Sequence, residues 1–276
     1  YASQLPGLVE DGALDIEVID AAVANILQAK FELGLFEKPY TDPEALPGIA
    51  NPEALATAKK AALQSVVMLK NNDGALPLSK DRLDKIAVIG QLADAPYEQL
   101  GTWIFDGDRE LSITALSGIR ELVGDDVKID YVRAMETSRS RSTEPFDEAV
   151  AAAENADAAV LFLGEESILS GEAHSRADIS LPGAQAELVR RIRETGKPVI
   201  AVIMAGRPLT LTDIVDDVDA ILFAWHPGTM GGPAIAELLF GHESPSGKLP
   251  ATFPRMEGQI PIYHSQKNTG KPPTPE

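Results

Sequence analysis

The sequence predicts an α/β protein, a three-layer α/β/α sandwich with a mostly parallel sheet of about six strands. Short, almost entirely apolar segments of strand length recur along the chain, such as IAVI at 86–89 and AAVLFL at 158–163. Segments with a helical spacing of apolar residues separate them, as at 113–123. Strands that are apolar on both faces and alternate with helices indicate a parallel sheet covered on both sides, joined by right-handed crossovers.

The N-terminal part of the chain predicts helices joined by a linker. Residues 1–34 predict one helix behind a polar lead, with Asp15 as its N-cap. Residues 35–50 carry prolines and no apolar period, which indicates a linker. Asn51 followed by Pro52 predicts a second helix start, because Asn caps the backbone and proline fits the first helical position.

The remaining elements alternate along the chain. A strand is expected in SVVMLK at 65–70, ending at an Asn-Asp-Gly turn. The predicted order that follows is strand 86–90, helix 113–123, strand 127–132, helix 146–154, strand 158–163, helix 183–195, strands 198–204 and 220–224, and helix 231–240. Because open α/β sheets bind ligands at the carboxyl ends of their strands, the loops after these strands are the places to search for a site.

Composition excludes several partners. The chain has 276 residues, with 24 Lys and Arg against 42 Asp and Glu, a formal net charge of -18. Such a surface repels nucleic-acid phosphates and anionic membranes, so neither is expected as a partner. Cys is absent, which excludes disulfides and thiolate chemistry, and no apolar segment approaches the roughly 18 residues of a membrane span.

The loop after strand 158–163 carries the densest set of reactive side chains. It reads GEESILSGEAHSRAD, and roughly 19 residues separate the strand from the next helix, whereas such loops usually have about 2–6. A carboxyl that acts as acid or base needs freedom to reach a substrate, which a long loop supplies. The candidates are Glu165, Glu166 and Glu172, beside Ser170, His174, Ser175 and Arg176. The residues alone favour a catalytic loop and a solvated acidic loop about equally and do not distinguish the glutamates.

Cofactor motifs do not match. Gly228, Gly231 and Gly232 precede the last helix without the dinucleotide pattern, so a tight turn with close packing is the better interpretation. No Walker pattern, zinc-binding His spacing or nucleophile elbow occurs, so we expect no metal and no cofactor. Trp103, in LGTWIFDGD, either stacks on a sugar ring or packs on the sheet.

Several segments resemble the second domain of glycoside hydrolase family 3, which includes β-glucosidases and β-xylosidases. The most specific are FLGEESILSGEAHSRADISLPGAQAELV and KPVIAVIMAGRPL. SVVMLKNNDGALPL, KIAVIG, LGTWIFDGD and AILFAWHPGTMGGPAIAELLFGHESPSGKLPATFP follow the family's order. ILQAKFELGLFEKPYTDP resembles the closing helix and linker of its first domain, a (β/α)8 barrel.

The resemblance implies a division of the chain and an activity. Residues 1–34 would be the barrel's terminal helix, 35–50 a linker, 51–264 the α/β sandwich, and 265–276 a tail or linker to a third domain. The implied enzyme is a retaining, exo-acting β-glycosidase that cleaves oligo- or aryl-β-glycosides, with the barrel as its partner in cis. Bacterial members are often periplasmic or secreted.

The resemblance also assigns site residues. Retaining glycosidases use two carboxyls about 5–5.5 Å apart. In the family an Asp of the barrel is the nucleophile, and Glu172 in SGEA matches the general acid/base. Glu165 receives a supporting role in binding or loop anchoring, and Trp103 a role in substrate binding. Arg176 either neutralises or positions a carboxylate or forms a structural ion pair. Without the barrel, the chain is expected to be inactive.

Two other functions stay open. One is a stand-alone α/β module that binds a sugar or a nucleotide, and the other is a structural domain that supports a partner. The absence of a phosphate-binding motif disfavours the nucleotide module. The carboxylate loop favours the glycosidase.

Overall fold

The computed structural model describes residues 1–265, 267 and 270 and divides the chain into two compact units, 1–49 and 50–276. The predicted tail at 265–276 therefore lies mostly outside the described residues. The first unit contains α1 (Leu5–Glu10), α2 (Ile16–Glu32) and a 3₁₀ turn at Pro43–Ala45.

α2 begins where the sequence predicts, because the Asp15 carboxylate accepts a hydrogen bond from the Glu17 backbone at 3.1 Å. The segment predicted as a polar lead forms α1 instead. Proline in its first turn favours that helix, and Gly12, with φ of 71°, lies in the turn that separates it from α2.

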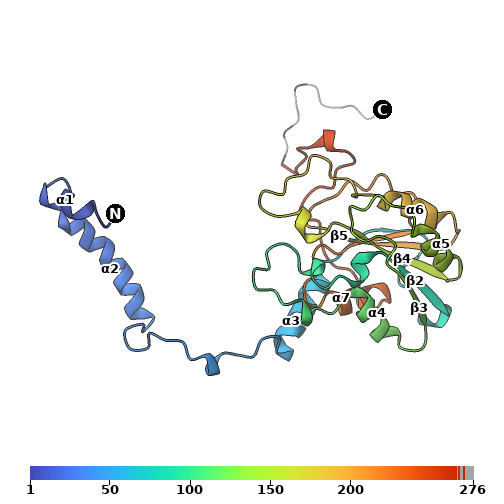
Figure 1. Ribbon diagram of the computed structural model, residues 1–276, viewed down its shortest axis with the longest axis horizontal. Helices are drawn as coiled ribbons and strands as arrows, with labels where there is room; N and C mark the ends of the chain where they lie inside the picture. The colour runs from blue at the N-terminus through green and yellow to red at the C-terminus, as the bar shows by residue number, and fades with distance from the viewer. Residues whose placement is uncertain (266, 268–269, 271–276) are drawn as a thin grey trace. The chain divides into compact units, whose positions relative to one another are not determined.

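The second unit is a three-layer sandwich around a six-stranded sheet (Figure 1). Its strands are β1 (Val67–Asn71), β2 (Lys85–Ile89), β3 (Lys128–Val132), β4 (Ala158–Gly164), β5 (Val199–Met204) and β6 (Ala220–Phe223). They lie in the order β1-β6-β5-β4-β2-β3, and every pair is parallel except β1 with β6. The mixed, mostly parallel sheet confirms the predicted fold class.

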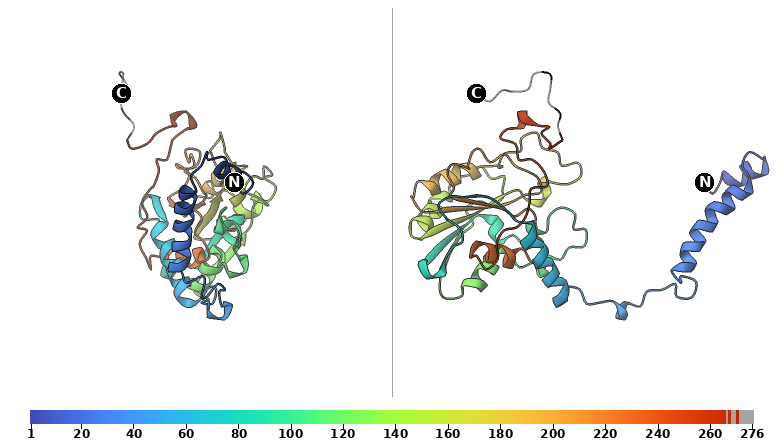
Figure 2. Two further views of the ribbon diagram at one scale, coloured as in Figure 1. Left: turned by 90° about the vertical axis from the view of Figure 1, so that its left-hand side faces the viewer. Right: turned by 180° about the vertical axis from the view of Figure 1, so that it is seen from behind.

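Helices cover both faces of the sheet (Figure 2). They are α3 (Pro52–Ser65), α4 (Ala115–Val123) and α7 (Gly231–Leu239) on one face, and α5 (Phe146–Glu154) and α6 (Gln185–Arg193) on the other. α3 starts at the predicted cap, since the Asn51 side chain accepts from the Ala54 backbone at 2.9 Å.

The core has two halves because each central strand is apolar on both sides. In β4, Val160 and Phe162 pack among one helix layer, whereas Leu161 and Leu163 pack among the other. All four side chains are fully buried, and each such burial contributes about 1.5–3 kcal/mol.

Glycines within α4 and α7 allow these two helices to approach closely. A Cβ at Gly232 would lie 2.1 Å from the carbonyl oxygen of Thr114, and one at Gly118 would lie 2.4 Å from Gly232. Contacts this short exclude any side chain at either position. The glycine-rich start of α7 therefore serves packing against α4, which is the interpretation that the sequence favoured over a phosphate cradle.

The parallel strands place four loops at one edge of the sheet. The carboxyl ends of β2, β4, β5 and β6 lead into the segments that begin at residues 90, 165, 205 and 224. In open α/β sheets this edge is where ligands bind.

Candidate active site

The loop that follows β4 is anchored at its start by a buried ion pair. Glu165 is only 1% exposed, and its two carboxylate oxygens accept hydrogen bonds from Arg176 and Arg207, the latter at 3.1 Å from Nε. A buried carboxylate is costly unless it is paired and hydrogen-bonded, and here both oxygens are satisfied. Arg176 belongs to the loop itself, so this pair joins the first residue of the loop to a residue near its far side.

Arg207, which follows β5, also fastens the middle of the loop. Its Nη2 donates to the carbonyl oxygen of Leu169 and to that of His174, the second at 3.0 Å. These carbonyls lie on either side of residues 170–173. The guanidinium therefore fixes the loop on both sides of its tip, which we define as residues 170–173. Glu172 is the carboxylate on that tip.

Glu166 is held by a different group of partners. Its carboxylate accepts from the Ser138 hydroxyl at 2.7 Å and from Arg139 Nε at 3.0 Å. Burial opposes ionisation, but the hydrogen bonds from Arg139 and Ser138 outweigh it, so the pKa of Glu166 is lowered. A carboxylate stabilised in this way is a poor general acid.

Glu172 contrasts with both neighbours. Its side chain is exposed, and in the described part of the chain it has no hydrogen-bond or ion-pair partner. The backbone turns sharply on both sides of it, with φ of 109° at Gly171 and 61° at Ala173. Gly171 is required here, because a Cβ would lie 2.3 Å from the Thr102 methyl carbon.

A second loop, which follows β2, meets the first at Thr102. The Thr102 hydroxyl shares its single proton between the carbonyl oxygens of Ser167 and Ser170, at 2.7 and 2.8 Å. The next residue, Trp103, is 61% exposed and meets Phe105 edge to face at 6.2 Å between ring centroids. Trp103 is therefore exposed and not packed on the sheet, whereas its stacking on a sugar ring stays a prediction.

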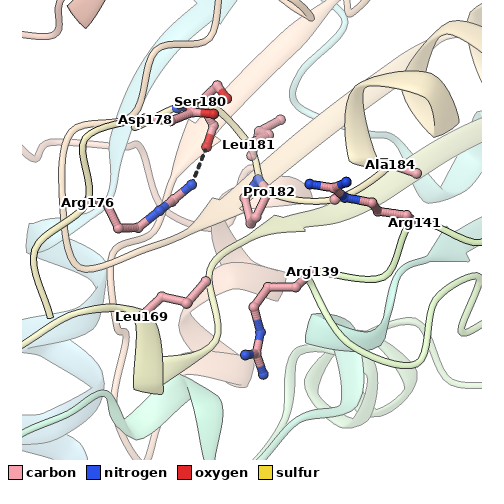
Figure 3. Close-up of a pocket in the computed structure, with 10 residues that line it drawn as sticks. Arg139, Arg141, Leu169, Arg176, Asp178, Ser180, Leu181, Pro182 and Ala184 are labelled. Carbon is pink, nitrogen blue, oxygen red and sulfur yellow. Dashed lines mark hydrogen bonds between the residues drawn. The ribbon is translucent and has the colours of Figure 1, made fainter.

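One cavity near this loop touches its anchored ends rather than its tip (Figure 3). It has a volume of about 600 Å³ and is lined by Leu169, Arg176, Arg139, Arg141, Asp178 and residues 180–184. The guanidinium groups of the three arginines point in different directions and do not converge. Arg176 is also engaged with the carbonyl oxygen of Ser180 at 3.3 Å.

Metal binding finds no support in the described residues, where no group of three or more His, Cys, Asp and Glu side chains is placed to hold an ion. None of the described helices combines the length and apolar character needed to cross a membrane.

The structure thus joins Glu165 to Arg176 directly and places the loop of Trp103 beside the loop of Glu172. It records no contact between Arg176 and Glu172 within the described residues. Sequence reasoning missed Arg207, Thr102 and His226, whose Nε2 lies 3.4 Å from the hydroxyl oxygen of Ser170 in the Glu172 loop. Arg207 and His226 follow β5 and β6 at the ligand-binding edge, so their positions after strand ends were the available signal.

Comparison with known proteins identifies the family. Residues 66–275 match the family described as Glycosyl hydrolase family 3 C-terminal domain. The chain is 40% identical to the periplasmic β-glucosidase of Salmonella typhimurium, over 100% of this chain and 39% of that protein. A β-xylosidase of Formosa agariphila is 38% identical, over 91% of this chain and 35% of that protein.

A solved structure agrees. A mutant β-glucosidase from Listeria innocua in complex with laminaribiose matches with a TM-score of 0.89 and 39% identity, over 98% of this chain and 37% of that one. The chain therefore spans well under half the length of the relatives that it matches. These matches confirm the resemblance read from the sequence: the chain belongs to glycosyl hydrolase family 3, and residues 66–275 carry that family's C-terminal domain.

Proposed function

We propose that this chain is part of a retaining, exo-acting β-glycosidase of the β-glucosidase type, in which Glu172 is the general acid/base. The supporting observation is the contrast among the glutamates of one loop. Arginines hold Glu165 and Glu166, whereas Glu172 is exposed and without a partner among the described residues. A carboxyl that must reach the oxygen of a leaving group has to be free of such partners.

The proposed reaction uses two carboxyl groups about 5–5.5 Å apart. Glu172 protonates the glycosidic oxygen while the nucleophile attacks the anomeric carbon and forms a covalent glycosyl-enzyme. Glu172 then accepts a proton from the water that releases the sugar with retained configuration.

The nucleophile is proposed to be an Asp of a preceding (β/α)8 barrel. In this arrangement residues 1–34 form the barrel's terminal helix, 35–50 the linker, 51–264 the α/β sandwich, and 265–276 a tail or link to a further domain. A general acid needs a raised pKa, which a neighbouring carboxylate and exclusion of water supply. Both would come from the barrel, so the chain by itself is proposed to be inactive.

The substrates are proposed to be oligo- or aryl-β-glycosides, with Trp103 stacking on a sugar ring. The β-glucosidase and β-xylosidase names of the relatives and the laminaribiose bound to the Listeria enzyme support this class. A periplasmic or secreted location is proposed from the name of the Salmonella relative.

The test is Glu172→Ala in the full-length protein that includes the preceding domain. Loss of an acid/base lowers the rate by about 10²–10⁴-fold with poor leaving groups. Formation of the glycosyl-enzyme from a dinitrophenyl β-glucoside should be spared, and azide should partly restore turnover by releasing a β-glycosyl azide.

The matched control is Glu154→Ala, which removes another exposed glutamate, at the end of α5, and should leave kinetics unchanged. Near-normal kinetics of Glu172→Ala with a phenyl β-glucoside would overturn the assignment. Measurable hydrolysis of aryl β-glucosides by purified chain 1–276 would overturn the proposal that the barrel is needed.

A further inference from the structure

We infer that Thr102 is a positioning residue whose hydroxyl fixes the position of the tip carrying Glu172 relative to the loop carrying Trp103. The inference rests on the proposed role of Glu172. It concerns how the carboxyl is held during proton transfer to the leaving group.

Thr102 is hydrogen-bonded to the Glu172 loop close to the tip. The hydroxyl reaches the carbonyl oxygen of Ser170 at 2.8 Å and that of Ser167 at 2.7 Å. Ser170 lies two positions before Glu172. Arg207 holds carbonyls on both flanks of the tip but makes no described hydrogen bond within residues 170–173. The Ser170 carbonyl oxygen is thus contacted by two side-chain groups, the Thr102 hydroxyl and Nδ1 of His174 at 3.1 Å, and of these only Thr102 belongs to the loop that carries Trp103.

The methyl group of Thr102 packs against the loop, whereas its hydroxyl group forms hydrogen bonds. The methyl carbon lies against Gly171, where an added Cβ would approach it to 2.3 Å. The hydroxyl supplies the hydrogen bonds. Valine keeps the shape of threonine and loses the donor, whereas serine keeps the donor and loses the methyl group. These two replacements separate packing from hydrogen bonding at one position.

Ser170 is confined from its other side as well. Its Oγ lies 3.0 Å from the Thr102 hydroxyl and 3.4 Å from Nε2 of His226. A Cβ at Gly206 would lie 2.5 Å from the same Oγ, so the backbone after β5 closes this side. Burial lowers the pKa of His226, against an opposing influence of Glu98, which favours the neutral imidazole as a neighbour of the serine hydroxyl.

Another anchor fixes the start of the same turn. The Glu98 carboxylate accepts from the Ser167 backbone at 2.5 Å, so the β2 loop holds the Glu172 loop at two points, Glu98 and Thr102. Of these, Thr102 is adjacent to Trp103 in sequence. A substrate ring stacked on the indole and a glycosidic oxygen protonated by Glu172 belong to one molecule, so the relative position of the two loops sets the geometry of protonation.

Loss of the hydroxyl should therefore weaken protonation selectively. A misplacement of about 1 Å at a reacting group costs about 10²-fold. For Thr102→Val we expect a loss of about 10–100-fold in kcat/KM for leaving groups that need protonation. Leaving groups that depart without protonation should be almost unaffected, because attack by the nucleophile does not depend on the tip.

The experiment measures kcat/KM of the full-length protein on aryl β-glucosides from phenyl to dinitrophenyl. The variants are Thr102→Val, Thr102→Ser and Glu172→Ala, with their unfolding midpoints as a check on folding. We expect Thr102→Val to steepen the dependence on leaving-group pKa, azide to restore part of its turnover, and Thr102→Ser to retain the wild-type dependence. Thr102→Ala replaces the valine variant if that protein does not fold.

The outcomes separate the two proposals. If kcat/KM depends on leaving-group pKa as in the wild type for Thr102→Val but steeply for Glu172→Ala, the positioning role is overturned and the acid/base assignment stands. A wild-type dependence for Glu172→Ala overturns the acid/base assignment itself. An equal loss of rate on all leaving groups in both Thr102 variants shows general damage and overturns the positioning role.

Discussion

The buried carboxylate of Glu165 should be a principal support of the loop that carries Glu172. The informative change is Glu165→Gln, which keeps the shape and removes the charge. The carboxylate accepts from Arg176 through one oxygen and from Arg207 through the other. A glutamine has only one acceptor oxygen, so its NH₂ group would face one of the guanidinium groups, donor against donor.

The expected cost follows from the burial of the three groups. Breaking a buried pair by removing one partner costs about 3–5 kcal/mol. The Glu165 side chain is 0% exposed, whereas those of Arg176 and Arg207 are 18% and 19% exposed. Water therefore reaches the arginines in part, which places the cost at the lower end, about 3 kcal/mol. For a domain of this size, that corresponds to a decrease in Tm of roughly 6–12 °C.

The assay is urea and thermal unfolding of chain 1–276 and its variants at pH 7. Glu172→Gln is the matched control, because it makes the same chemical change on the same loop at an exposed side chain without a described partner. Such a surface substitution should change the free energy of unfolding by no more than about 0.5 kcal/mol. Equal midpoints for the two variants would refute the reasoning that Glu165 anchors the loop through a buried ion pair.

Two further changes test the neighbouring residues. Glu166→Gln should cost about 1–3 kcal/mol of stability at pH 7 through its charge-assisted hydrogen bonds. Because the folded pKa of Glu166 is lowered, this contribution is present above the ordinary carboxyl value of 4.5 and is lost as the pH falls through the lowered value. Urea unfolding at pH 7 and pH 3 checks it, and a difference between variant and wild type that does not shrink at pH 3 contradicts the cause. Trp103→Ala in the full-length protein should raise KM by about tenfold, equivalent to about 1.4 kcal/mol, with a smaller effect on kcat. Steady-state kinetics on a β-linked disaccharide decides this, and an unchanged KM argues against stacking.

Much of the fold follows from local sequence because the signals for it are local. β2, β4, β5 and β6 are buried on both faces, so their apolar runs indicate a covered parallel sheet without knowledge of any partner. The direction of β1 has no such local signal. Its antiparallel pairing with β6 at the sheet edge joins residues far apart in the sequence, such as Val67 and Phe223, so no local pattern indicates it.

The candidate loop could also be found locally, since its length and its carboxylates are properties of one continuous segment. The choice among its glutamates could not be made in this way. Arg139 lies 27 positions before its partner Glu166, and Arg207 lies 42 positions after its partner Glu165. No spacing rule connects residues this far apart in the sequence. The exposure of Trp103 could not be predicted from local sequence either, because it depends on which other segments pack over the indole in the folded chain.

Anchoring at the flanks and freedom at the tip have a common physical basis. Ordering each residue of a long loop costs about 1–2 kcal/mol of backbone entropy, so a loop of this length keeps a defined path only where strong contacts offset that cost. Those contacts, from Arg207 and Thr102, converge on residues 167–174 and leave the Glu172 side chain untouched. Under the proposed function, this chain determines where the carboxyl is held, and the barrel determines its affinity for a proton. Substitutions at the anchors should then change the position of the acid, which the dependence of the rate on the leaving group reports. Substitutions in the barrel should change the pKa of the acid, which the pH profile reports.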